Sequence, residues 1–596
     1  MLALRDRLRS QHCAVYLQTV GGDVPMTREA AAVRSPHSSW PRLTLDLLTP
    51  LALYAAAVTW LTWPLALFLS TRLPGTPTAY DALFTAWVLS WETHALATDP
   101  SRLLDTNIYY PTKRTLFYGP TVPGLLPYFA PPFVLSGNPT LALNLTTLAS
   151  VTLTAWTLHV VIWRWTRSHL AGVIAACAWL TNRWVLWTAA LVPQWAVVQY
   201  LPLIVALTAS PAPSFRHAAL TLPFILLQCL SEPMYVAPAV GAVLGLIALR
   251  RAVQPVTRAA GLRLLGALTL AGIPLLPIYA GYLDVVRRNP DLEAQTPWLI
   301  DPKQWIAMTP WPWQGGPAAL SSAAVAVGAL GAGLYLRRTL VSGTDNRLRE
   351  AWQHATLWMV IGFVLALPCV FLTPLTRIVR VPVRFGVIAG IALCLLAGLG
   401  FSECVRWFAG RRLARPLRAA ATGFAVALMY WGYLTGRDPL RSQAEPIVAY
   451  PTFEAPAADS TPLRIAGSVR GPLLELPVDV DGQMRAAVAM YRSISGWQPL
   501  LNGYSSYFPA DFPARMALAG RLPDAEALVR LWRETGVTAV LVHLDTRRLS
   551  PQQRAFVELA RRGGGSGLQL MAHDDKMLVF YVTIVNGSVP GPDGAP

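Results

Sequence analysis

Apolar residues recur along this chain in runs long enough to cross a lipid bilayer. A transmembrane helix needs about 20 predominantly apolar residues, and runs of this order follow one another between residues 45 and 436. We predict eleven transmembrane helices, of which the short third to sixth leave the count open by one or two. The predicted spans are 45–70, 139–163, 168–182, 195–210, 217–231, 233–249, 264–283, 317–336, 355–373, 385–404 and 419–436.

The pattern changes on both sides of this membrane region. Residues 1–44 are polar and contain arginine, without the apolar core and cleavage site of a signal peptide, so we predict a cytoplasmic N-terminal arm. From residue 437 the patterns of strands and helices alternate. We predict an extracytoplasmic α/β domain over 437–585 and a disordered Gly/Pro-rich tail over 586–596. The expected elements are strands at 473–477, 537–544, 568–573 and 576–584, a helix at 523–533 that stops at Gly536, and a helix that starts with the capping box Ser550–Gln553.

Charged residues make up 14% of the chain and hydrophobic residues 54%, whereas about a quarter of a soluble protein is charged. This deficit excludes an ordinary cytosolic enzyme, a disordered chain and a nucleic-acid-binding protein. The formal net charge is +17, and all of the excess lies in residues 1–436, where 33 basic residues stand against 16 acidic ones. After residue 436 the 16 basic and 16 acidic residues cancel.

The arginines predict the orientation, because cytoplasmic loops of membrane proteins carry an excess of Lys and Arg. The short loops 164–169, 211–217, 250–263, 337–353 and 406–418 hold 16 Arg and two acidic residues. We therefore place these loops and the N-terminus in the cytoplasm. The long loop 71–138, the segments 284–316 and 374–384 and the C-terminal domain then lie on the outer face.

The first outer loop, 71–138, is long, and long loops are often functional rather than mere spacers. Its start predicts a helix with Asp81 and Glu92 on one face and Trp87, Trp91 and His94 on the opposite one. We predict that this helix lies flat at the membrane interface, with its aromatic side chains in lipid and its carboxylates toward water or a cavity. Asp81 is then either a reactive carboxylate or the cap of this helix.

Arginines also stand at the outer boundary, against the positive-inside trend. Arg380 and Arg384 precede the tenth predicted span. A desolvated phosphate must be matched by cations and hydrogen-bond donors, so we predict that these two residues bind a lipid phosphate. Unselective binding of lipid headgroups is the alternative. Arg183, near the outer end of the third predicted span, is a further candidate for the same role.

Two other polar positions interrupt apolar sequence. Glu232 lies in an apolar stretch, where an ionisable residue is a functional hypothesis by default, although Pro233 also allows a solvated outer turn. Gln194 either lines the same substrate cavity as Glu232 or forms hydrogen bonds with backbone groups that Pro193 leaves without a partner. The sequence has no Walker loop, HExxH or CxxC motif and no Cys pair at metal-ligand spacing. We therefore predict neither a metal site nor a cofactor.

The order of one span, a long outer loop that opens with an acidic residue, a helix bundle and an outer domain resembles the GT-C superfamily of polytopic glycosyltransferases. This superfamily includes the protein O-mannosyltransferases and bacterial lipid-sugar transferases. The resemblance covers residues 45–582 and extends to a subfamily of bacterial membrane proteins that share several short phrases. Those phrases are Asp81…Trp87…Trp91…His94, Asn107-Ile-Tyr-Tyr-Pro111, Gln194-Trp195…Tyr200-Leu-Pro-Leu203, Arg380-Val-Pro-Val-Arg-Phe385 and Leu501-Asn-Gly-Tyr-Ser505.

The resemblance implies an enzyme of the bacterial inner membrane that transfers a sugar from a polyprenyl-phosphate donor to an extracytoplasmic glycan, lipid or protein. It gives Asp81 the role of general base or of a metal ligand. Many members carry a second acid next to this position, where this chain has Ala82. That departure leaves Glu92 as a rival base and leaves a divalent cation without support. The residues expected to contact substrate are His94, Asn107, Tyr109, Gln194, Glu232, Asn502 and Tyr504, with packing as the alternative for His94 and for the segment 496–509 that holds Asn502 and Tyr504.

Two other functions stay open at this point. The first is a transporter or flippase of lipid-linked sugars, although such proteins usually pair two halves around a midplane site and no repeated half is visible here. The second is a non-catalytic scaffold for envelope assembly that binds partners through its outer domain.

Overall fold

The computed structural model describes residues 40–75, 80–182, 184–186, 193–210, 215–289, 322–342, 346–366, 382–409, 415–435, 450–456, 460–478, 483–545 and 548–584. By its internal contacts the chain divides into Met1–Thr49 and Pro50–Pro596. The membrane helices and the C-terminal sheet belong to the second unit, to which the following description applies.

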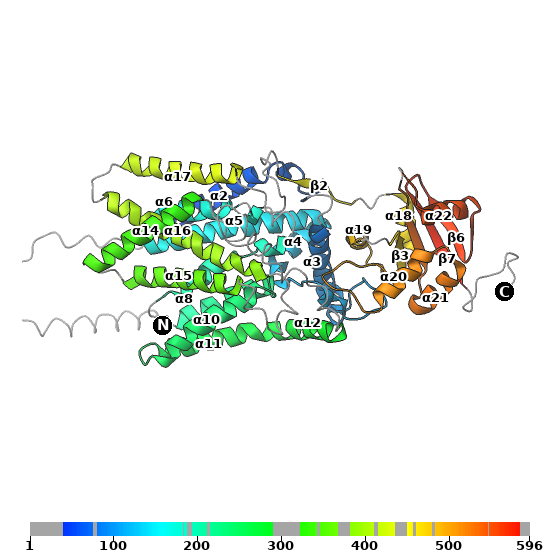
Figure 1. Ribbon diagram of the computed structural model, residues 1–596, viewed down its shortest axis with the longest axis horizontal. Helices are drawn as coiled ribbons and strands as arrows, with labels where there is room; N and C mark the ends of the chain where they lie inside the picture. The colour runs from blue at the N-terminus through cyan, green and yellow to red at the C-terminus, as the bar shows by residue number, and fades with distance from the viewer. Residues whose placement is uncertain are drawn as a thin grey trace, which may run out of the picture. The chain divides into compact units, whose positions relative to one another are not determined.

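Helices occupy the intervals in which the sequence predicts membrane spans (Figure 1). The long helix α5, Pro139–Thr166, is followed by the short α6, His169–Leu180, and α8, Leu201–Thr208. The remaining helices of this region are α2 (Trp40–Leu61), α9 (Phe215–Ser231), α10 (Val236–Val253), α11 (Arg258–Gly272), α12 (Leu276–Arg288), α14 (Ser322–Ser342), α15 (Asn346–Ala366), α16 (Gly386–Ala409) and α17 (Arg415–Thr435).

Within the described ranges, five helical stretches are both long and apolar enough to cross a membrane. They are Pro139–Thr166, Val236–Val253, Arg258–Arg288, Ala323–Val341 and Gly386–Phe408. In the predicted crossing at 195–210 the α-helix is α8, whose eight residues extend about 12 Å, less than a hydrocarbon core of about 30 Å. Length and apolar character therefore support a mostly helical membrane protein, whereas the count of eleven spans stays a prediction.

Glycines let three of the long helices approach one another closely. A Cβ atom added to Gly331 on α14 would overlap the backbone of Gly400 on α16. Nearer the start of α16, a Cβ atom on Gly362 of α15 would overlap the backbone nitrogen of Ala389. Small residues at such crossings are the usual device for helix packing in membranes, where burial of apolar surface supplies no driving force.

We expect Gly331→Ala to destabilise the folded protein by about 1–3 kcal/mol, because the added methyl group must separate α14 from α16. Gly333→Ala is the matched control on the same helix, since a Cβ atom there meets no other atom. By helix propensity alone, the change from glycine to alanine stabilises a helix by up to about 1 kcal/mol in either variant. Thermal unfolding of both variants in detergent measures the difference. Equal unfolding temperatures would show that the Gly331–Gly400 crossing is not tight.

The first long loop folds into a series of short elements around one helix. These are β1 (Arg72–Pro74), α3 (Tyr80–Thr98), the 3-10 turns Pro100–Arg102, Thr115–Tyr118 and Pro123–Leu125, and α4 (Leu126–Ser136). Strand β1 pairs antiparallel with β2, Thr452–Glu454. This pairing ties the loop to the segment that follows the last membrane helix.

The prediction that the aromatic face of α3 lies in lipid is wrong. Trp87 and Trp91 are buried in protein, and their indole nitrogens donate to the side chain of Asn107 (3.1 Å) and to the carbonyl of Leu103 (2.9 Å). The ring of Trp91 also meets the ring of Trp497 edge-on at 5.3 Å. An apolar helix face is equally compatible with lipid and with protein, and here the C-terminal part of the chain covers it.

The C-terminal part contains a five-stranded sheet of order β3-β4-β7-β6-β5. Strands β3 (Leu473–Leu476) and β4 (Ala539–His543) are parallel, whereas β7 (Met577–Val582), β6 (Leu568–His573) and β5 (Gly564–Gly565) join antiparallel. The helices of this part are α18 (Thr461–Ser468), α19 (Gln483–Ser493), α20 (Phe512–Arg521), α21 (Ala525–Thr535) and α22 (Pro551–Arg561). The capping box of Ser550 and the left-handed end at Gly536 (φ +64°) are confirmed.

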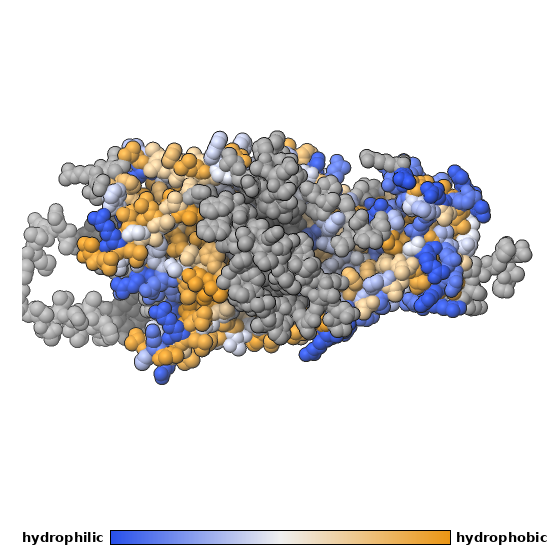
Figure 2. Space-filling view, in the orientation of Figure 1, coloured by the Kyte–Doolittle hydropathy of each residue, from blue (hydrophilic) through white to orange (hydrophobic). Residues whose placement is uncertain are grey.

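The surface shows the same contrast in composition. In Figure 2 hydrophobic residues gather over the membrane helices, whereas hydrophilic residues are frequent over the C-terminal sheet and its helices. On this face of the molecule the two parts therefore meet different surroundings. The side of the membrane on which the C-terminal sheet lies stays a prediction from the arginine distribution.

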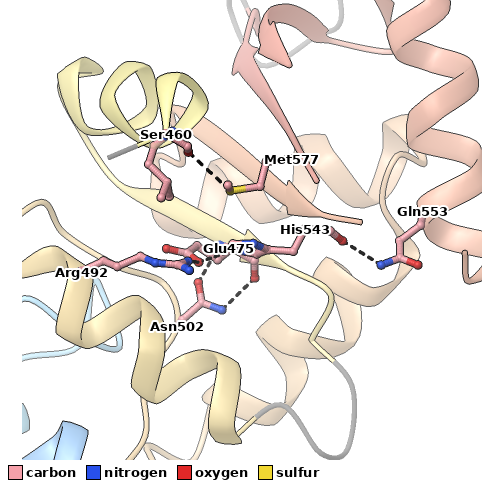
Figure 3. Close-up of polar contacts among 8 residues, drawn as sticks. Ser460, Glu475, Arg492, Asn502, His543, Gln553 and Met577 are labelled. Carbon is pink, nitrogen blue, oxygen red and sulfur yellow. Dashed lines mark hydrogen bonds and ion pairs between the residues drawn. The ribbon is translucent and has the colours of Figure 1, made fainter. Parts of the chain in front are cut away.

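A buried carboxylate joins the sheet to α19 (Figure 3). Glu475 on β3 is 2.7 Å from Nε2 of His543 on β4 and 3.5 Å from Nη1 of Arg492 on α19. Burial alone would raise the pKa of Glu475, but the hydrogen bond to His543 and the charges of both partners hold it below its usual range. The carboxylate is therefore ionised at neutral pH and links the sheet to the helix that packs on α3.

Candidate active site

Asp81 lies in the first turn of α3, where a phenol from the far end of the sequence reaches it. The hydroxyl of Tyr504 donates to Oδ1 of Asp81 at 3.0 Å. The ring of Tyr504 is held edge-on by Tyr80 at 5.6 Å and by Phe84 at 6.1 Å, both on α3. Asp81 in the first long loop and Tyr504 in the C-terminal region, which were predicted as separate candidates, are thus direct neighbours.

Arg384 lies in the 3-10 turn Pro382–Phe385 just before α16. Its Nη1 donates to the hydroxyl of Tyr235 at 3.2 Å, and its guanidinium carbon is 5.1 Å from the centre of the same ring. Phe385 packs edge-on against Tyr235 at 5.5 Å. Tyr235 was not among the residues predicted from the sequence, where only its place shortly after Glu232 could have suggested it.

Glu232 is buried between α9 and α10, so the predicted alternative of a solvated outer turn is wrong. Its Oε2 accepts hydrogen bonds from the backbone nitrogens of Tyr235 (2.6 Å) and Val236 (2.7 Å). These two N–H groups are free at the start of α10, and a carboxylate there also meets the positive end of the helix dipole. Glu232 therefore anchors the start of α10, next to Tyr235, which contacts Arg384.

Asp81, Glu232 and Arg384 form one electrostatic cluster, because the guanidinium interacts with both carboxylates. Burial raises the pKa of Asp81, while the hydrogen bond from Tyr504 and the charge of Arg384 oppose that rise. A carboxylate with a raised pKa accepts a proton more readily than one in water. The chemistry available here is thus proton acceptance beside a fixed cation.

Gln194 borders the same part of α3. Its Oε1 accepts a hydrogen bond from Thr85, one helical turn after Asp81, at 2.7 Å. The hydroxyl of Thr85 also approaches the backbone carbonyl of Asp81 at 2.7 Å. Gln194 therefore supports the turn of α3 that presents Asp81, and its own amide oxygen is engaged by the protein.

Glu92 occupies a separate place on α3. It stands eleven residues after Asp81, which corresponds to about 16 Å along a helix. Its Oε1 accepts a hydrogen bond from Thr121, while its buried Oε2 has no hydrogen-bond partner in the described part of the chain. Burial raises the pKa of Glu92 to about 7, against the hydrogen bonds from Thr121 and Val122.

This raised pKa predicts a pH-dependent contribution to stability. Between the ordinary pKa of a glutamate, 4.5, and the folded value of about 7, the folded chain binds a proton at Glu92 that the unfolded chain has released. The free energy of unfolding therefore falls as the pH rises through this interval. We expect Glu92→Gln to remove that part of the decline, measured as the unfolding temperature in detergent at pH 5 and pH 8. The wild type and the variant losing the same stability between these pH values would contradict it.

Asn107, Tyr109 and Asn502 hold the C-terminal part against the first long loop. The side-chain amide of Asn107 accepts a hydrogen bond from Trp87 and donates one to Ser493 (2.9 Å). The side-chain amide of Asn502 accepts from the backbone N–H of Glu475 and donates to its carbonyl. The backbones of 107–110 and 500–502 are also hydrogen bonded, and Leu473 and Leu501 continue this ladder to β3. These polar groups bond within the protein, in agreement with the packing alternative for the segment that holds Asn502. Contact of these residues with substrate stays a prediction.

Two further side chains complete this junction. His94 stacks on Trp497, with ring centres 4.8 Å apart, in agreement with the packing alternative. Arg515, which sequence reasoning missed, is buried and donates to the carbonyl of Tyr110 (2.8 Å) and to the hydroxyl of Thr112 (2.9 Å). Its position in an amphipathic helix far from the loop gave no signal of this contact. The other predicted phosphate-binding residues, Arg183 and Arg380, lie outside the described residues.

No family model matches this chain, and no curated protein matches it. Among solved structures it is similar to the oligosaccharyltransferase of Archaeoglobus fulgidus in the apo form, at 13% identity and a TM-score of 0.43, over 85% of this chain and 70% of the other. The archaeal oligosaccharyltransferase AglB of the same organism, in complex with an inhibitory peptide and a dolichol-phosphate, gives 12% identity and a TM-score of 0.45, over 92% and 75% of the two chains. A third structure, tethered to an acceptor peptide, gives 13% identity and a TM-score of 0.42. Function must therefore be argued from the site.

Proposed function

We propose that this chain is an integral membrane glycosyltransferase that transfers a sugar from a polyprenyl-phosphate donor to an extracytoplasmic acceptor. The observation that supports it is the meeting of Asp81, Tyr504 and Arg384 at one place, from three distant parts of the sequence. A base whose pKa is lowered by the charge of a nearby cation suits transfer from a phosphate leaving group.

In the proposed reaction Asp81 is the general base. As the acceptor hydroxyl attacks the anomeric carbon, its proton passes to the Asp81 carboxylate and a new glycosidic bond forms. The bond between the anomeric carbon and the phosphate oxygen breaks, and its electron pair stays on the polyprenyl phosphate. Proton transfer of this kind contributes about 10²–10⁴-fold to a rate. Attack on the side opposite the phosphate inverts the anomeric configuration.

Arg384 would stabilise the phosphate as negative charge develops on the leaving oxygen. A guanidinium offers several donors in a planar fork that suits phosphate oxygens. The cluster holds one cation against two carboxylates, so a bound phosphate needs further positive charge or a proton. Arg380 is the proposed second cation. A divalent cation is the other source of charge, although the described residues hold no group of three or more His, Cys, Asp or Glu that could bind a metal ion.

The distribution of arginines suggests on which side of the membrane the proposed site lies. With the Arg-rich loops in the cytoplasm, the site and the C-terminal sheet lie on the outer face of a bacterial inner membrane. The donor would then be reached from the outer leaflet, and the acceptor would be a glycan, lipid or protein outside the cell.

The direct test supplies purified protein in liposomes with a panel of radiolabelled polyprenyl-phosphate sugars and cell-envelope acceptors. The expected result is labelled acceptor together with free polyprenyl phosphate. A parallel reaction with EDTA shows whether transfer requires a divalent cation. If the labelled lipid crosses the bilayer unconsumed, the chain is a transporter, and if it is neither consumed nor moved, the scaffold function holds.

Tyr504→Phe tests the role of the phenol in tuning the base. The hydrogen bond from Tyr504 lowers the pKa of Asp81, so its loss should raise that pKa further. Because the base works in its ionised form, the acidic limb of the pH–rate profile is expected to move to higher pH. Tyr80→Phe serves as the control, since it keeps the ring that packs edge-on against Tyr504. An unmoved acidic limb in Tyr504→Phe would show that the phenol does not control the base.

A further inference from the structure

A large cavity lies between four helices, at the other end of α10 from the candidate active site. Its volume is about 1210 Å³, and residues of α10, α14, α15 and α16 line it. On α10 the lining begins at Leu246 and includes Arg250 and Arg251. Arg250 lies about 22 Å along the helix axis from Tyr235, the residue just before α10. The cavity is therefore separate from the cluster around Asp81.

The lining changes from charged to apolar along the helices. The charged end is formed by the last turn of α10 and the first turns of α15, with Arg250, Arg349 and Glu350. The rest is lined mainly by aliphatic and small side chains, and on α14 the lining runs from Ala324 to Thr339. Fifteen residues of helix extend about 22 Å, which exceeds the half-thickness of a bilayer core, about 15 Å.

Two of the lining arginines make no short polar contact in the described part of the chain, although the charge of Arg250 helps to lower the pKa of Glu350. Arg250 and Arg349 are exposed and make no hydrogen bond or ion pair with the described residues. In contrast, Arg251 donates to the carbonyls of Thr208 (2.7 Å) and Ser210 (3.2 Å), and Glu350 pairs with His354 at 3.5 Å. The single acidic residue in the lining is thus already engaged.

Two buried rings in the wall add unused hydrogen-bonding capacity. Trp352 and His354 line the cavity, and the indole nitrogen of one and Nδ1 of the other are buried without a hydrogen-bond partner among the described residues. Trp352 stacks on Tyr335 of α14, with ring centres 4.9 Å apart. This stacked pair holds the wall between α14 and α15 next to the charged end.

We propose that this cavity binds a membrane lipid with an anionic phosphate headgroup, with the phosphate at Arg250 and Arg349 and the hydrocarbon chain along α14. Basic pockets between transmembrane helices recognise such headgroups through charge, and the apolar part of the cavity excludes a fully hydrated anion. By the arginine distribution this end faces the cytoplasm, whereas the donor site lies at the outer face. The lipid site is thus independent of the proposed transfer reaction.

The test uses the full-length protein, purified in neutral detergent and titrated with lipid while bound lipid is counted by native mass spectrometry. The probes are phosphatidylglycerol, a polyprenyl phosphate, phosphatidylcholine and inorganic phosphate. Removing both cations in Arg250→Gln/Arg349→Gln is expected to weaken binding of the anionic lipids roughly 30-fold, since each cation near an anionic lipid contributes about fivefold. Arg164→Gln/Arg337→Gln is the matched control, because it removes two exposed arginines that do not line the cavity.

A second variant tests the apolar part without changing charge. Ala329→Phe places a ring among the lining residues of α14 and should reduce lipid binding while free phosphate stays unbound. A preference for phosphatidylglycerol or for polyprenyl phosphate identifies the source of the lipid, and either result supports the site. Equal losses in the two double variants, or full lipid binding by Ala329→Phe, would overturn the proposal, as would equal binding of phosphatidylcholine.

Discussion

Asp81→Asn is expected to lower the rate of sugar transfer by about 10²–10⁴-fold, the contribution of a positioned general base. Asparagine has nearly the same shape and can still accept the hydrogen bond from Tyr504, so the fold should be kept. The loss should appear in kcat, because the base acts as the acceptor hydroxyl attacks. Single-turnover transfer from a labelled polyprenyl-phosphate sugar measures it.

Glu92→Gln is the matched control on the same helix. Glu92 was a rival base in the sequence, but it lies about three turns from Asp81 and its carboxylate contacts Thr121. We expect this variant to retain transfer close to that of the wild type. Full activity in Asp81→Asn together with loss in Glu92→Gln would move the base to Glu92. Full activity in both would leave the site without a catalytic carboxylate.

Arg384→Gln is expected to raise the KM for the donor about 10- to 100-fold, as for the loss of a hydrogen bond to a charged group. Arg384→Lys should recover part of this, because lysine keeps the charge but not the planar fork. The effect should be larger on the donor than on the acceptor, which steady-state kinetics with each substrate varied in turn can separate.

Tyr235→Phe provides the control for this prediction. It removes the hydroxyl that Arg384 contacts at 3.2 Å but keeps the ring under the guanidinium. We expect only a small change in the donor KM. A donor KM that is unchanged in Arg384→Gln, with a folded protein, would exclude Arg384 from phosphate binding.

Much of the helical pattern is predictable from the sequence, because apolar runs of membrane length have few other uses. The positions of the long helices α5, α10, α14 and α16 follow from it directly. The surroundings of a helix do not, and α3 shows why. Its tryptophans would satisfy lipid and protein equally well, so sequence reasoning put them in lipid, whereas the structure covers them with the chain around Asn107 and Trp497.

The candidate site was predictable residue by residue but not as an arrangement. Asp81, Glu232 and Arg384 attract attention singly, since each is a charge at an apolar boundary. Nothing in the local pattern around Tyr504 indicates that its hydroxyl reaches Asp81, because that contact depends on the packing of the whole C-terminal part. For the same reason Arg515, which fixes the backbone around Tyr110, could not be found.

The contact between Tyr504 and Asp81 also sets an order in the biogenesis of the protein. The two residues are 423 positions apart, and at about 5–20 residues per second their synthesis is separated by roughly 20–85 s. The membrane helices that follow α3 are made within that time. Tyr504, Trp497 and Arg515 leave the ribosome only after them. The site is therefore assembled last, when the end of the chain docks on its beginning.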